Sequence, residues 1–180
     1  WAIVRQRAAA VGVVCLPKSR LGIPDRGHTP EQARAQLALL IETADAWGTP
    51  YLIVNAETEV KPLELGGIIT PAEIADAIGE REAVISTEAW LYAMDWAPLQ
   101  RYPVLLQIYQ ADNGWAIEEI PERQAECVRR ARDYGFTYVG VTFQTYAGAQ
   151  PSWYDLSGTA WSLFTGDDVA AGNWWKWAGP

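Results

Sequence analysis

The sequence is poor in the residues that metal and redox chemistry use. Its 180 residues include one histidine and only two cysteines, Cys15 and Cys127. This set lacks the ligands of a zinc site, and two cysteines alone are not the framework of a disulfide-rich domain. We therefore expect two buried free thiols, no bound metal and no cofactor.

Positive charge is also scarce, and long apolar runs are absent. The chain has 14 Lys and Arg against 22 Asp and Glu, which gives a formal net charge of −8. An acidic surface repels phosphate backbones, so we expect no nucleic-acid partner. No apolar run approaches the roughly 20 residues of a membrane-spanning helix, so we expect no membrane partner either. The sequence starts with Trp1 instead of Met, and we expect it to be part of a longer protein.

The composition that remains is that of a folded domain with an unusual choice of aromatics. Apolar residues make up 49% of the chain, which is ordinary for a globular protein. Ten Trp and eight Tyr stand against three Phe. Trp and Tyr combine an aromatic ring with a hydrogen-bonding N–H or O–H group, which suits a cleft that is partly open to water. The high number of Trp and Tyr therefore indicates a binding cleft.

The sequence predicts three helices, over residues 30–47, 71–78 and 121–134. Thr29 and Thr70 each precede a proline and stand three residues before Gln or Glu, which is the pattern of a capping box. Gly48 and Gly135 follow an aromatic residue at the ends of the first and third helices, where a left-handed glycine terminates a helix.

Six short apolar runs predict strands, at residues 11–16, 51–54, 83–85, 104–108, 138–143 and 160–164. Most are continuous instead of alternating, which is typical of parallel strands buried on both faces. Residues 44–54 and 131–141 also repeat one frame, in which Ala, an aromatic residue, Gly, Tyr and Val recur at equal spacing. The alternation of strands and helices predicts an α/β fold.

Within the α/β class, a doubly wound sheet and a (β/α)8 barrel both fit the repeated helix-to-strand joint. No GxGxxG or P-loop follows any predicted strand, which argues against a nucleotide-binding sheet. Six units in 180 residues extrapolate to about 240 for eight, close to the ~250 of a TIM barrel. We expect residues 1–180 to form a single TIM-type barrel domain that lacks its first one or two βα units.

In such a barrel the site is built from the loops that follow the strands. Several of these loops carry a carboxylate, and tryptophans accompany two of them. Paired carboxylates are the groups that glycoside hydrolysis uses, and aromatic faces stack on sugars. The catalytic candidates are Glu57, Glu59, Asp167 and Asp168. The substrate-binding candidates are Glu88, Trp90, Tyr109, Asp112, Trp115, Gln144 and Tyr146.

Each candidate also has a structural interpretation. Glu57 and Glu59 could be solvated loop acids, although like charges held close together raise one pKa and so produce a general acid. Asp167 and Asp168 could form a turn. Trp90 could pack between a helix and the barrel. A calcium or magnesium site built from Glu57, Glu59 and Asp112 is a further, weaker alternative, because no dense acidic loop is present.

The order of these segments resembles the lysozymes of glycoside hydrolase family 25. It runs from an acidic-x-Glu pair after a strand, through Pro-Val-Leu-Leu-Gln-Ile-Tyr and Phe-Gln-Thr-Tyr, to Asp near the last strand. The resemblance covers residues 50–169 and implies a (β/α)-barrel muramidase with Glu59 as proton donor. Glu57 stands where the family has Asp. The Trp-rich loops are also similar to barrel domains of phage tail and cell-wall proteins.

Two functions therefore follow. The first is hydrolysis of a polysaccharide or cell-wall glycan by paired carboxylates. The second is a non-catalytic structural or glycan-binding domain, with other subunits of a virion or larger assembly as partners. Either function predicts a virion or extracellular location.

Overall fold

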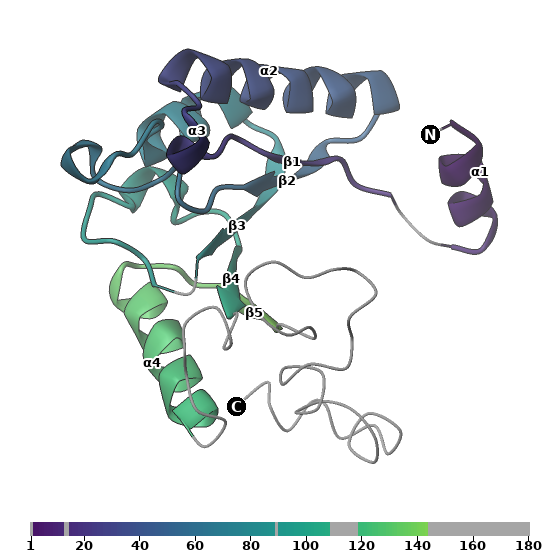
Figure 1. The fold of residues 1–180 in the computed structure, drawn as a ribbon. Helices are drawn as coiled ribbons and strands as arrows, with labels where there is room; N and C mark the ends of the chain where they lie inside the picture. The colour runs from purple at the N-terminus through teal and green to yellow at the C-terminus, as the bar shows by residue number, and fades with distance from the viewer. Residues whose placement is uncertain (1, 13–14, 89, 109–118, 144–180) are drawn as a thin grey trace, which may run out of the picture. The chain divides into compact units, whose positions relative to one another are not determined.

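The computed structural model describes residues 2–12, 15–88, 90–108 and 119–143 (Figure 1). The chain divides into two compact units, Trp1–Ile85 and Ser86–Pro180. The helices are α1 (Ala2–Ala10), α2 (Pro30–Trp47), α3 (Pro71–Ile78) and α4 (Ile120–Asp133). The strands are β1 (Lys18–Arg20), β2 (Tyr51–Asn55), β3 (Glu82–Glu88), β4 (Val104–Ile108) and β5 (Val139–Phe143). Short 3-10 helices cover Pro24–Arg26, Leu63–Leu65 and Ala97–Leu99.

The strands form a five-stranded sheet whose order, β1 to β5, is the order of the chain. The pairs β1–β2 and β4–β5 are parallel, with Arg20 opposite Asn55 and Val104 opposite Val139. Sequential parallel neighbours with helices between them are the βα pattern that the sequence predicted. The α/β class is thus confirmed, while closure of the sheet into a barrel and its organisation as one domain stay predictions.

The first unit owes its core to the apolar face of α2. Leu37, Leu40 and Ala44 recur at three- and four-residue spacing on this helix and are buried. The helix contacts both β1 and β2, where Leu52 and Val54 are also buried. These contacts fix α2 over the first two strands.

Both capping boxes are formed as the sequence predicted. The Thr29 side chain accepts a hydrogen bond from the Gln32 N–H, and the Gln32 side chain accepts one from the Thr29 N–H. Thr70 and Glu73 exchange the same two bonds at the start of α3. Each box satisfies two N–H groups that the first turn of a helix leaves unpaired.

The second unit has its own apolar core. Helix α4 contacts β4 and β5, and its Cys127 and Ala131 are buried. The centre of the Trp96 ring lies 6.0 Å from the centre of the ring of Phe136, which follows α4. Gly135 has a φ of 88°, so the predicted left-handed glycine is present, and a Cβ there would lie 2.5 Å from the Gln100 side chain.

One prediction about the first unit was wrong, and one helix was missed. The strand expected at residues 11–16 is not there in the described part of that range, and the paired strand is Lys18–Arg20. Helix α1 was not predicted, because Ile3 and Val4 are its only apolar residues larger than alanine and are too few to show a helical period. None of its residues is buried. The strand expected at residues 160–164 lies outside the described residues. Among those residues, no helix combines the length and apolar character of a membrane span.

Glu73 makes two interactions that substitutions can separate. Its Oε2 accepts the Thr70 N–H at 2.9 Å, and its Oε1 forms an ion pair with Arg34 at 2.7 Å. Glu73→Ala removes both interactions and should lower the free energy of unfolding by about 1 to 2 kcal/mol. Glu73→Gln keeps the cap and should cost about 0.5 kcal/mol. Urea denaturation measures both, and a Glu73→Ala variant as stable as wild type contradicts this account.

Candidate functional site

Two acidic side chains follow β2 in the loop that precedes α3. Asn55 ends the strand, and Glu57 and Glu59 come two and four residues later. Arg20 ends β1 and lies opposite Asn55 in the parallel register. The carboxyl ends of β1 and β2 therefore bring one cation and two carboxylates to the same edge of the sheet.

The Arg20 guanidinium binds both carboxylates. Its Nη2 lies 3.0 Å from Glu57 Oε2, and its Nε donates to Glu59 Oε1 at 2.9 Å. The same Nε also lies 3.0 Å from the Gly22 carbonyl oxygen. Because one planar group contacts both acids, it holds them at a fixed separation and offsets their mutual repulsion.

Glu59 is completely buried, with a side-chain exposure of 0%. Its Oε1 also accepts the Gly22 N–H at 3.0 Å, and its backbone carbonyl accepts the N–H groups of Ile68 and Ile69. Its Oε2 is buried and has no hydrogen-bond partner among the described residues. Burial raises the pKa of Glu59, although the bonds from Arg20 oppose the shift.

Glu57 differs from Glu59 because it reaches the surface. Its side chain is 17% exposed. Oε1 accepts a hydrogen bond from Asn55 Nδ2 at 2.8 Å, and Oε2 faces Arg20. Of the two acids, Glu57 is therefore the one whose carboxylate can meet a ligand without movement of the loop.

The loop that carries both acids is closed by a tight backbone approach. A Cβ at Gly67 would lie only 1.9 Å from the Lys61 carbonyl oxygen, so no other residue fits there without a shift of the backbone. The loop also returns through Ile68 and Ile69 to the Glu59 carbonyl. Arg20 thus binds the side chain of Glu59, and the returning loop binds its main-chain carbonyl.

In the second unit, two polar side chains of β3 and β4 are joined. Gln107 Nε2 donates to Ser86 Oγ at 3.1 Å, and both residues are buried. The candidates Glu88 and Trp90 follow in the same unit and are partly exposed. Arg130 of α4 lies 5.7 Å from the centre of the Trp90 ring and donates to the Leu91 carbonyl. Trp90 thus contacts a helix residue, while its role as a sugar platform stays a prediction.

The remaining site candidates lie outside the described residues. They are Tyr109, Asp112, Trp115, Gln144, Tyr146, Asp167 and Asp168. The structure brings together Glu57 and Glu59 and leaves the other catalytic candidates as predictions. The described part of the chain holds no group of three or more His, Cys, Asp or Glu that could bind a metal ion. Cys15 and Cys127 are free, but only Cys127 is buried.

Sequence analysis missed Arg20 and Asn55. Arg20 was overlooked because the strand was placed at residues 11–16, which left its end unassigned. Asn55 was read only as part of the loop after β2. The signal that could have found Asn55 is its position two residues before Glu57, since side chains two apart at a strand end lie on one side.

The comparisons with known proteins agree with the fold. No protein-family model matches the sequence, and no curated protein matches it. Among solved structures, the chain is similar to the endo-β-N-acetylglucosaminidase from Cordyceps militaris in its apo form, with a TM-score of 0.52 at 15% identity. The match covers 97% of this chain and 61% of that one, so this chain spans about three fifths of its neighbour's length. At this identity the likeness concerns the fold alone.

The burial of Glu59 predicts a specific dependence of stability on pH. Because its pKa is raised, the folded state binds more protons than the unfolded state above the ordinary value of 4.5. Its contribution to the free energy of unfolding is therefore complete below that value and is lost as pH rises through the folded-state pKa. Glu59→Gln should remove this loss, so the stability difference between variant and wild type should shift in favour of the variant with rising pH.

The measurement is urea denaturation of both proteins between acidic and neutral pH. Glu64→Gln, at an exposed acid of the same loop, is the matched control and should follow wild type. A difference between Glu59→Gln and wild type that is constant, or that shifts against the variant as pH rises, contradicts the raised pKa.

Proposed function

We propose that this chain is part of a glycan-cleaving barrel domain and that Arg20, Glu57 and Glu59 form part of its active site. The observation that carries the proposal is the pair of carboxylates held by one guanidinium at the carboxyl ends of β1 and β2. That edge of a parallel sheet is where (β/α) barrels place their active sites. The fold likeness to an endo-β-N-acetylglucosaminidase supports the same class of substrate.

Glu57 and Glu59 have different roles in this proposal. Glu57 contacts the sugar, because its carboxylate is partly exposed and is oriented by Asn55 and Arg20. A carboxylate in this position stabilises the positive charge that develops on the sugar ring during cleavage. Glu59 has no exposed surface, and we assign it the task of holding Arg20, and through Arg20 the orientation of Glu57.

The family-25 resemblance implies a different division, in which Glu59 donates the proton. Its raised pKa suits that role, since a general acid must hold its proton near neutral pH. For Glu59 to act in this way, the loop would have to open and expose Oε2. Hydrolysis of peptidoglycan, which the same resemblance implies, is the finer form of the proposal.

A second candidate is glycan binding without cleavage. The complete burial of Glu59 favours it, because one of the two acids is committed to the structure. In that case the partly exposed carboxylate of Glu57 accepts hydrogen bonds from sugar hydroxyls, and no glycosidic bond is broken. This candidate carries with it the prediction that the protein is attached to a virion or cell wall. Its location would then be the virion or the outside of the cell.

The two divisions of labour predict opposite mutant phenotypes. We expect the purified protein to release reducing ends from peptidoglycan or from oligomers of N-acetylglucosamine. Glu57→Gln should lower the rate at least ~100-fold, because it removes the carboxylate that meets the sugar. Glu59→Gln should lower it about tenfold or less, because its amide oxygen still accepts from Arg20 and Gly22.

Glu64→Gln serves as the control, since Glu64 is an exposed acid of the same loop outside the Arg20 cluster. Loss of activity in Glu59→Gln with retention in Glu57→Gln assigns the proton donor to Glu59 and contradicts our division. Binding of the same glycans without any release of reducing ends rejects cleavage in favour of the second candidate.

A further inference from the structure

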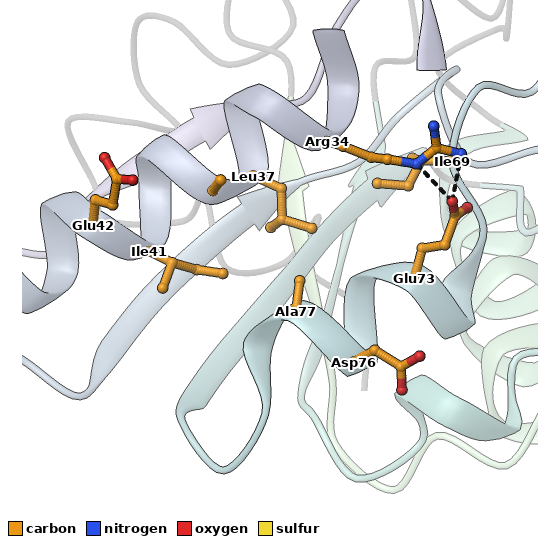
Figure 2. A pocket seen from close by; sticks show the side chains of 9 residues that line it. Arg34, Leu37, Ile41, Glu42, Ile69, Glu73, Asp76 and Ala77 are labelled. Carbon is orange, nitrogen blue, oxygen red and sulfur yellow. Dashed lines mark hydrogen bonds and ion pairs between the residues drawn. The ribbon is translucent and has the colours of Figure 1, made fainter. Parts of the chain in front are cut away.

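An apolar groove of about 620 Å³ separates α2 from α3 on the first unit (Figure 2). Its walls include Leu37 and Ile41 of α2, Ala77 of α3, and Ile69 from the segment before α3. Ala77 is exposed and Ile41 is partly exposed, so the apolar surface is open to solvent. The groove is independent of the carboxylates at the end of β2, since none of Arg20, Glu57 and Glu59 lines it.

Two ion pairs fix the separation of the groove's walls. Arg34 of α2 donates to Glu73 of α3 at 2.7 Å, as the dashed lines in Figure 2 show. Arg81, which follows α3, binds Asp45 near the end of α2 at 3.0 Å. Closing the gap between the helices would break both ion pairs, so these contacts oppose closure of the groove.

The rim of the groove is acidic and unbalanced. Glu42 on α2 and Asp76 on α3 are exposed, and neither forms an ion pair or hydrogen bond among the described residues. Arg34 is the one cation among the groove's lining residues, and it is already bound to Glu73 and Glu31. An occupant that fits must therefore combine an apolar face with positive charge.

Helix α1 of this same chain has that chemistry. It contains Arg5 and Arg7 but no acidic residue, and none of its residues is buried. At about 100° per residue, Ile3, Val4 and Arg7 share one side of the helix, and Arg5 lies on the opposite side. Ile3 and Val4 are 67% and 53% exposed, and Arg7 has no ion pair among the described residues.

The opposite side of α1 is already attached to its own chain. Arg5 Nη2 donates to the Trp47 carbonyl at 2.6 Å, and its guanidinium lies 4.8 Å from the centre of the Trp47 ring. This contact anchors the helix beside the end of α2 and leaves the side with Ile3, Val4 and Arg7 facing away. None of the residues of α1 lines the groove of its own chain.

We propose that α1 of one copy docks into the α2–α3 groove of a second copy. Ile3 and Val4 cover the apolar floor, and Arg7 lies between Glu42 and Asp76. The lengths agree, because nine helical residues span about 14 Å and the eight residues of α3 span about 12 Å. Exchange of α1 in both directions gives a closed dimer with the same contact made twice.

Sedimentation velocity of the purified protein over a range of concentrations tests the proposal. Wild type should form a dimer in about 0.1 M salt and dissociate more readily in about 1 M salt, where the screening length falls from about 10 to about 3 Å. Ile3→Asp and Arg7→Glu should each raise the dissociation constant at least about tenfold. Arg7→Glu combined with Asp76→Arg restores the opposite charges and should recover most of the affinity.

Leu39→Asp is the matched control. Leu39 is an exposed residue of α2, two positions from both Leu37 and Ile41 and therefore on the side away from the groove. Ala77→Glu provides a second disruption within the groove at an exposed position, so the test does not depend on one variant that fails to fold. The proposal is overturned if wild type is monomeric at every concentration, or if a dimer persists in Ile3→Asp, Arg7→Glu and Ala77→Glu alike.

Discussion

The guanidinium of Arg20 is the group on which the edge of the sheet depends. Burying a carboxylate is costly unless charge and hydrogen bonds compensate it, and Glu59 receives both from Arg20 and from the Gly22 main chain. The buried acid also fixes the loop after β2. The N–H groups of Ile68 and Ile69, where this loop returns, donate to the Glu59 carbonyl. Glu57 is oriented by the same cation but keeps access to solvent. One side chain from β1 thus binds both acids, of which only Glu57 reaches solvent.

This arrangement connects the fold to the proposed chemistry. Parallel pairing places Arg20 beside Asn55, so side chains about 35 positions apart in the sequence reach one site. Of the side chains gathered at this edge, the partly exposed Glu57 carboxylate is the acid that a ligand can reach. The groove between α2 and α3 lies outside this cluster and concerns association of two copies of the chain. The proposed active site and the proposed dimer can therefore be tested independently.

Features set by local interactions were predictable from the sequence, and features set by pairing were not. Thr29 and Thr70 identify the starts of α2 and α3 because a capping box involves residues only three apart. Strand β1 was misplaced because Lys18–Arg20 carries no apolar signal, and it is a strand only through its register with β2. The partner of Glu57 and Glu59 was missed for the same reason. The burial of Glu59 was equally hidden, since an acid in a loop is ordinarily solvated.

A double-mutant cycle between Arg20 and Glu59 tests the central claim most directly. The free energies of unfolding of wild type, Arg20→Ala, Glu59→Ala and the double variant give the interaction energy of the two side chains. We predict a favourable coupling of about 1 to 3 kcal/mol, because each single variant leaves the other group without its charged partner. A coupling within about 0.3 kcal/mol of zero means that the two side chains act independently, and it contradicts the account.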